Sequence, residues 1–214
     1  NGTTTTAVDG TITYTATNGD VNLSTLSNNA SIKVSAANGA IIDNNGTSNN
    51  ITAQNVSLLA KNGIGSAKAI DTQVANLAAK NITTGNIAIE NTGDLLITTV
   101  DGLVGVENQA AAGKVKIETH SDLTVNSDGQ IITNGGDIEL EADGNVNVHK
   151  VSTDGTFTGS SSPAAGTVTV TAGADIQDSY DVNSNPDDIY DISAKNIVLN
   201  AGNDIGTGLL APIE

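Results

Sequence analysis

A short sequence pattern recurs along the whole chain and constrains the fold more than any other feature. Each copy has apolar residues at its third and fifth places and a small residue, most often alanine, at its seventh. A Gly, Asn or Asp pair and a second short apolar stretch follow. The copies start at Gly10, Ala30, Gln54, Gly85, Gly113, Gly136, Gly166 and Lys195, at spacings of 20 to 31 residues. A self-similar unit of this length predicts a solenoid, in which each coil packs on its neighbours.

Alternation of apolar and polar residues predicts strands within each coil. The segments 11–15 and 167–171, both rich in threonine, show the alternation most clearly. Helical spacing is nearly absent, and its best candidate, residues 73–80, is expected to be a loop or short turn. Short strands separated by Asn, Gly and Asp corners predict an all-β fold, a parallel β-helix of about eight coils. The inward apolar residues of successive coils should then stack in one narrow core.

The pattern also predicts which outward residues face each other. Between the copies at Gly113 and Gly136 the register has no gap, which places Lys114 over Asp137 and Lys116 over Glu139. Three carboxylates share one coil position: Glu90, Glu118 and Glu141. Polar insertions at 43–50, 154–165 and 177–191 are expected to be surface loops at corners. The segment starting at Ile51 recurs 141 residues later at Ile192, which indicates duplication of a block of coils.

Composition excludes several classes of function. The formal net charge is −16, from 24 carboxylates against 8 lysines, with no arginine. Nucleic acid is therefore not an expected partner, because affinity for phosphate requires clustered basic residues. There is no cysteine, and so no disulfide or thiol chemistry. No apolar run approaches the roughly 20 residues of a membrane-spanning helix, so direct membrane insertion is not expected. We expect the 214 residues to be one β-helical region that continues into further repeats of a longer chain.

Two segments carry a resemblance to a known family. They are Asn62-Gly63-Ile64-Gly65-Ser66-Ala67 and Gly85-Asn86-Ile87-Ala88-Ile89-Glu90-Asn91-Thr92-Gly93-Asp94-Leu95. Both resemble the repeats of filamentous haemagglutinin and of the large haemagglutinin-like surface adhesins of bacteria. The resemblance implies a right-handed β-helical shaft on the surface of, or secreted by, a Gram-negative bacterium. It further implies a role in cell attachment or biofilm cohesion, with a host or bacterial surface receptor or glycan as partner.

The candidate metal site is an acidic segment near the C-terminus. Asp181, Asn183, Asn185 and Asp187 follow the ligand spacing at the start of a calcium loop. However, Pro186 stands where such a loop has glycine, and Ile192 stands where it has a bidentate glutamate. A solvated acidic insertion is the alternative. No other cofactor is expected.

Catalytic arrangements are not evident in the sequence. His120 is expected to lie beside Asp143, and the chain's other histidine, His149, occupies a different coil position. The two histidines therefore cannot form a joint metal site. Paired carboxylates could cleave polysaccharides, but such a groove needs aromatic platforms for sugar stacking, and the chain has four aromatic residues. The sequence predicts a non-catalytic shaft. A polysaccharide-acting β-helix, such as a lyase or tailspike segment, and a calcium-dependent adhesive module are the alternatives.

Overall fold

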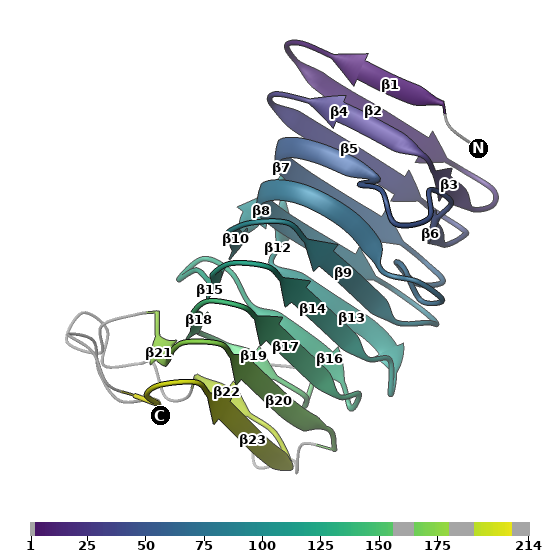
Figure 1. Ribbon diagram of the computed structural model, residues 1–214. Helices are drawn as coiled ribbons and strands as arrows, with labels where there is room; N and C mark the ends of the chain where they lie inside the picture. The colour runs from purple at the N-terminus through teal and green to yellow at the C-terminus, as the bar shows by residue number, and fades with distance from the viewer. Residues whose placement is uncertain (1–2, 156–164, 180–190, 207–214) are drawn as a thin grey trace.

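The computed structural model describes residues 3–155, 165–179 and 191–206. These residues form a parallel β-solenoid, whose strands stack coil upon coil along one axis (Figure 1). The predicted all-β class and the parallel β-helical fold are confirmed. The described residues contain no helix, and therefore none that is long and apolar enough to cross a membrane.

The N-terminal part of the solenoid has three short strands in each coil. Each strand pairs in parallel with its equivalent in the next coil. The strands of the first coil are β1 (Thr4–Ala7), β2 (Thr11–Ala16) and β3 (Val21–Leu23). Those of the second are β4 (Thr25–Asn28), β5 (Ser31–Ala36) and β6 (Ile41–Asp43). The long strand β7 (Ile51–Ala60) then covers both β4 and β5.

The strand β8 (Ile70–Asn81) is the point at which the arrangement changes. On one side it pairs with β7 over most of its length. On its other side it pairs with three strands: β9 (Ile87–Asn91) at its start, β10 (Leu95–Ile97) in its middle and β13 (Val106–Ala111) at its end. One edge of the long strand β8 is thus shared among three strands of the next coil.

Beyond β8 the strands form three parallel stacks. The first contains β9, β14 (Val115–Thr119), β17 (Ile138–Ala142), β20 (Thr167–Ala172) and β23 (Asn196–Ala201). The second contains β10, β15 (Leu123–Val125), β18 (Val146–Val148) and β21 (Ile176–Asp178). The third contains β13, β16 (Ile131–Asn134), β19 (Val151–Ser152) and β22 (Ile192–Ser193).

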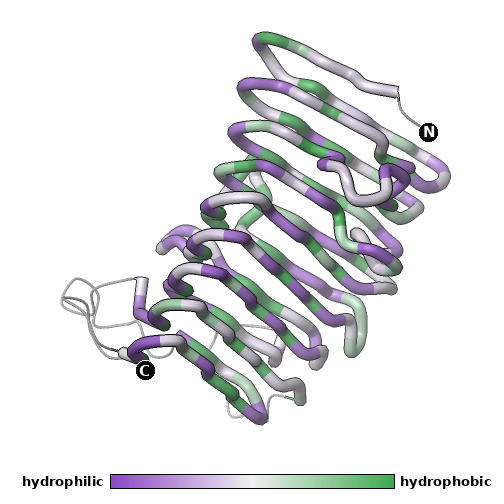
Figure 2. Tube along the Cα trace, viewed as in Figure 1, coloured by the Kyte–Doolittle hydropathy of each residue, from purple (hydrophilic) through white to green (hydrophobic). Residues whose placement is uncertain are grey.

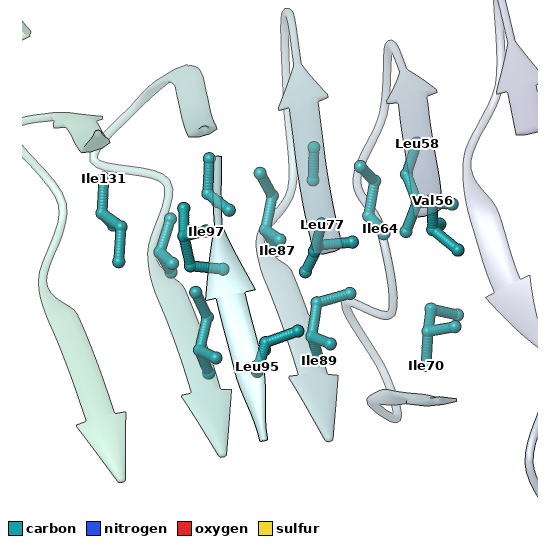
Figure 3. Close-up of a cluster of buried hydrophobic side chains, with 14 of the residues drawn as sticks. Val56, Leu58, Ile64, Ile70, Leu77, Ile87, Ile89, Leu95, Ile97 and Ile131 are labelled. Carbon is teal, nitrogen blue, oxygen red and sulfur yellow. The ribbon is translucent and has the colours of Figure 1, made fainter. Parts of the chain in front are cut away.

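The core is a continuous column of aliphatic side chains between these stacks. Hydrophobic residues recur along the coils from one end to the other, and hydrophilic residues occupy many of the turns (Figure 2). Ile64, Ile87 and Leu77 are among the fully buried side chains that point into this column (Figure 3). Inward residues of neighbouring coils lie one above another, because parallel pairing in register superimposes equivalent positions. Burial of apolar area in this column is the main force that holds the coils together.

Two series of stacked residues correct the repeat alignment derived from sequence. Ladder 1 contains Ile12, Ile32, Val56, Leu77, Ile97 and Val125. Ladder 2 contains Val21, Ile41, Ile64, Ile87, Val115, Ile138, Val168 and Ile197. The alignment placed Val56 and Ile87 at equivalent positions, but they lie in different ladders. It was wrong at this step because Val56 of β7 stacks on Leu77 and Ile97, whereas Ile87 of β9 stacks on Ile64. The same pattern is thus used on another side of the solenoid beyond β8.

The expectation for residues 73–80 was also wrong. They belong to β8 and are neither a turn nor a loop. Ala78 and Ala79 are buried there, where larger side chains would be typical of a strand. Because these residues are small, the sequence pattern did not indicate a strand here. Pairing with both neighbouring coils stabilises it.

The glycines that begin several copies of the pattern are required by crowding between coils. A Cβ atom on Gly136 would lie 2.1 Å from the carbonyl oxygen of Gly113, and one on Gly166 would lie 2.4 Å from that of Gly136. Neither glycine has a φ in the left-handed region. Close approach of the backbones, rather than an unusual turn conformation, therefore explains these two positions.

Gly136→Ala tests this explanation, because crowding predicts that the substitution lowers the free energy of unfolding rather than raises it. Where a backbone can accept alanine, Gly→Ala stabilises a protein by about 0.4–1 kcal/mol through the unfolded state. Here the clash with Gly113 should dominate, and we expect a loss of about 1–3 kcal/mol in the free energy of unfolding. Chemical denaturation of the variant beside the wild type measures the difference. A variant as stable as the wild type would show that the coils can separate to accommodate the methyl group.

Asp and Asn side chains at one corner link each coil to the next. Their oxygen atoms accept hydrogen bonds from backbone N–H groups one coil further on. The pairs are Asp94 with Asp122 N (3.3 Å), Asp122 with Asn145 N (2.7 Å), Asn145 with Asp175 N (3.1 Å) and Asp175 with Asp204 N (3.0 Å). Part of the acidic character of the chain is therefore structural.

Candidate functional site

The acidic ladder, Glu90, Glu118 and Glu141, is a surface feature that could act on a ligand. These glutamates belong to β9, β14 and β17 and are in register across the three strands, as predicted. Their side chains point outward because they alternate with the core residues of the same strands. All three are partly exposed. Carboxylates stacked one coil apart repel each other, so this ladder requires nearby positive charge.

Lysines beside the acidic ladder supply part of that charge. Lys116 Nζ lies 3.4 Å from Glu118, 3.0 Å from Glu141 and 3.8 Å from Glu139. Hydrogen bonding to Glu141 raises the pKa of Lys116. Lys114 pairs with Asp137 at 2.7 Å. The predicted placements of Lys114 over Asp137 and of Lys116 over Glu139 are confirmed.

His120 lies at one end of the same cluster, just after β14. Its Nε2 atom is 3.2 Å from Glu90 Oε1, and its Nδ1 atom is 3.1 Å from Asp143 Oδ2. The predicted contact with Asp143 is confirmed, whereas the contact with Glu90 was not anticipated. Hydrogen bonding to Glu90, and then to Asp143, raises the pKa of His120. His149, the other histidine of the chain, is buried.

Glu90, Glu118 and His120 each have one donor atom that lies within 4.8 Å of those of the other two. One imidazole and two carboxylates form a donor set that a metal ion can use. Beside them, Glu118, Glu141 and Asp143 line a shallow depression of about 240 Å³. It is a depression on the outer surface of the stack and no aromatic side chain lines it. The platform that sugar stacking requires is therefore missing from its lining.

A β-hairpin forms a second surface feature. The strands β11 (Thr99–Val100) and β12 (Leu103–Val104) are the one antiparallel strand pair among the described residues. The hairpin contacts β7 and β8, and Asp101 at its tip forms an ion pair with Lys33 of β5. Ser57 donates a hydrogen bond of 3.3 Å to the same carboxylate. The hydrogen bond from Lys33 lowers the pKa of Asp101.

A groove of about 310 Å³ lies between the hairpin and the outer face of β5 and β7. Hydroxyl and amide groups line much of it, among them those of Ser31, Asn55, Ser57 and Thr99. Sequence analysis missed this feature. The dipeptide Asp101-Gly102 could have indicated it, because both residues have positive φ, 52° and 81°, as a tight two-residue hairpin turn requires.

The insertion at 43–50 is a corner loop, as predicted, and a buried polar cluster holds it in place. Lys68 Nζ lies 2.7 Å from Asp43 and 2.8 Å from Asp71. The side chain of Asp43 is 2% exposed. Burial alone would raise the pKa of Asp43, but hydrogen bonds from Lys68, Asn50 and Asn45 hold it below its ordinary value. Lys68 thus neutralises two carboxylates that burial would otherwise penalise.

Asp43→Asn should show how this cluster depends on pH. Because its pKa is lowered in the folded state, the contribution of Asp43 to stability is fully present above the ordinary pKa of 3.8, and it is lost as the pH falls from there through the lowered pKa. We therefore expect the variant to melt at a lower temperature than the wild type at neutral pH. The difference in midpoint should shrink below about pH 4. Thermal melts of both proteins from pH 3 to 7 measure it, and a difference that is unchanged at pH 3 would contradict the assignment.

The calcium candidate, Asp181, Asn183, Asn185 and Asp187, lies outside the described residues. Parts of the insertions at 154–165 and 177–191 lie outside them as well. No protein-family model, curated protein or solved structure matches the chain.

Proposed function

We propose that this chain is a shaft segment of a secreted or cell-surface bacterial adhesin of the haemagglutinin-like kind. In this proposal it is a right-handed solenoid of about eight coils, it is not an enzyme, and it supports cell attachment or biofilm cohesion. A host or bacterial surface receptor, or a glycan, is the proposed partner. The resemblance in sequence suggests this role, and the architecture described above is compatible with it.

The observation that carries the proposal is the contrast between the inside and the outside of the coils. Inward residues of ladder 2 are Val or Ile throughout. The outward position between the two core residues of the strands changes from Ala88 to Lys116, Glu139, Thr169 and Val198. A solenoid of this kind can be long and stiff while its surface residues vary. These properties suit a spacer that projects another region of the protein.

The hairpin groove beside Lys33 and Asp101 is the surface that we propose for contact with a polar partner. It is lined by hydrogen-bonding groups and is held by an ion pair between segments far apart in the sequence. Hydroxyl and amide groups can recognise a glycan or a polar peptide surface by hydrogen bonding.

Attachment assays test this function. We expect beads coated with the protein to adhere to bacterial or host cells several-fold more than beads coated with the heat-unfolded protein. Lys33→Ala should reduce adhesion if the hairpin groove makes contact, whereas Lys61→Ala provides a matched control at another partly exposed lysine. Equal adhesion by folded and unfolded protein would contradict the proposal.

The two alternatives give different results. Release of reducing ends from a polysaccharide panel, abolished by replacing one carboxylate, would favour a polysaccharide-acting enzyme. A higher melting temperature with calcium, reversed by chelator, would favour a calcium-dependent module. For a shaft we expect neither result.

A further inference from the structure

The accessible imidazole of this chain is confined to one place. The sequence contains two histidines and no cysteine. His149 is 1% exposed, whereas the side chain of His120 is 44% exposed. Transition metals of the zinc type favour imidazole and thiolate donors. His120 is therefore where such an ion from solution would bind first.

The distances between donor atoms around His120 are close to those between the ligand atoms of a zinc site. Nε2 of His120 lies 3.2 Å from Glu90 Oε1. Ligand atoms in a tetrahedral zinc site are about 3.4 Å apart, given metal–ligand distances of roughly 2.0–2.1 Å. A carboxylate oxygen of Glu118 lies within 4.8 Å of a donor atom of each of these two residues. Since both glutamates are partly exposed, small rotations of their side chains can bring the three donors around one ion.

Asp143 gives His120 the orientation that a metal ligand needs. It faces Nδ1 of the imidazole at 3.1 Å, on the opposite side of the ring from Glu90. Metal-binding histidines almost always donate their other ring N–H to a carboxylate or carbonyl group, which fixes the tautomer with a free Nε2. Asp143 is thus a positioning residue, and it leaves Nε2 directed toward Glu90.

We propose that His120, Glu90 and Glu118 bind a divalent transition-metal ion of the zinc type, with water completing its coordination. The ion would join β9 to β14 and neutralise two carboxylates of the acidic ladder. Lys116 competes for Glu118 at 3.4 Å, but it lies closer to Glu141, at 3.0 Å, and can remain there when Glu118 turns toward a metal. Calcium and magnesium favour oxygen donors alone and should bind less well. This inference does not depend on the adhesin proposal.

The test is titration of the whole protein with zinc chloride at pH 7.5, followed by calorimetry and by thermal melting. We expect saturable binding of one ion and a higher melting temperature, with no comparable effect of calcium or magnesium at the same concentration. Since the chain has two histidines, imidazole nitrogen NMR can also detect coordination directly. Zinc should shift the Nε2 signal of His120 and leave the signals of His149 unchanged.

Variants separate a specific site from general attraction to an acidic surface. His120→Gln should weaken zinc binding at least 100-fold, and Glu90→Gln or Glu118→Gln at least tenfold. Asp143→Asn should weaken it about 10–100-fold, as removal of an outer-shell partner does elsewhere. Glu139→Gln is the matched control, because it removes the same charge from a neighbouring exposed position and should leave the affinity unchanged. Absence of saturable binding, undiminished binding by His120→Gln, or equal weakening by Glu139→Gln would overturn the proposal.

Discussion

Leu140→Ala is expected to lower the free energy of unfolding by about 2–5 kcal/mol, the largest effect of a single truncation that we predict. Leu140 is 0% exposed and stacks between Ile117 and Val170 in the parallel strands on either side. Loss of its side chain removes apolar burial and opens a cavity between three coils. Neighbouring coils cannot close that cavity, because their backbones are held in register by hydrogen bonds on both sides of β17.

Glu139→Ala is the control for this prediction. Glu139 precedes Leu140 in β17 and points to the opposite, exposed side of the strand. Its contact with Lys116 spans 3.8 Å at the surface, so we expect a change within about 0.5 kcal/mol. Urea denaturation of both variants gives the comparison. Similar losses for the two substitutions would mean that the aliphatic column does not dominate the stability of the solenoid.

Asn50→Ala is expected to cost about 2–4 kcal/mol, since each buried polar group left without a partner costs about 1–3 kcal/mol. The Asn50 side chain is fully buried, and it connects three levels of the solenoid. Its amide nitrogen donates to the Leu23 carbonyl at 3.2 Å and to Asp43 at 2.7 Å. Its oxygen accepts from the backbone N–H of Asp71 at 2.9 Å. Alanine would leave these groups buried without this partner.

Two further substitutions show whether hydrogen bonding causes the loss. Asn50→Asp keeps the size of the side chain but cannot donate to Asp43, and it places a second carboxylate beside it, so we expect it to be at least as destabilising at neutral pH. Asn44→Ala removes an exposed asparagine from the same loop and should change the stability by less than about 0.5 kcal/mol. If Asn50→Ala were as mild as Asn44→Ala, the buried cluster would not be what holds the corner loop.

Much of the fold followed from local pattern. The alternation in residues 11–15 predicted a strand, because threonines alternate there with apolar residues at a period of two, and the structure has β2 at Thr11–Ala16. The register of Lys114 with Asp137 followed because two copies of the pattern match without a gap. The contact between His120 and Asp143 followed from the same match. The two correct contact predictions both concern neighbouring coils in which two copies of the pattern match without a gap.

The predictions failed for contacts and strands that the local sequence pattern does not specify. The contact of His120 with Glu90 depends on a rotation of the imidazole between two strands, which no spacing specifies. The contact of Asp101 with Lys33 joins residues 68 positions apart, because a hairpin folds back over earlier coils. The strand at 73–80 was missed because alanines carry little strand signal, whereas pairing with β7 and with the strands beyond it fixes that segment.

By itself the sequence determined that this chain forms short parallel strands around a narrow aliphatic column, because the period-two pattern and its recurrence leave few other ways to bury the apolar residues. The tertiary structure decided on which side of the column each strand lies. The similar segments at Ile51 and Ile192 show the difference, since Val56 lies in ladder 1 and Ile197 in ladder 2. Each copy of the pattern satisfies a strand on any side equally well. Hydrogen bonding to the coil before it selects the side, and that information is not local to the copy.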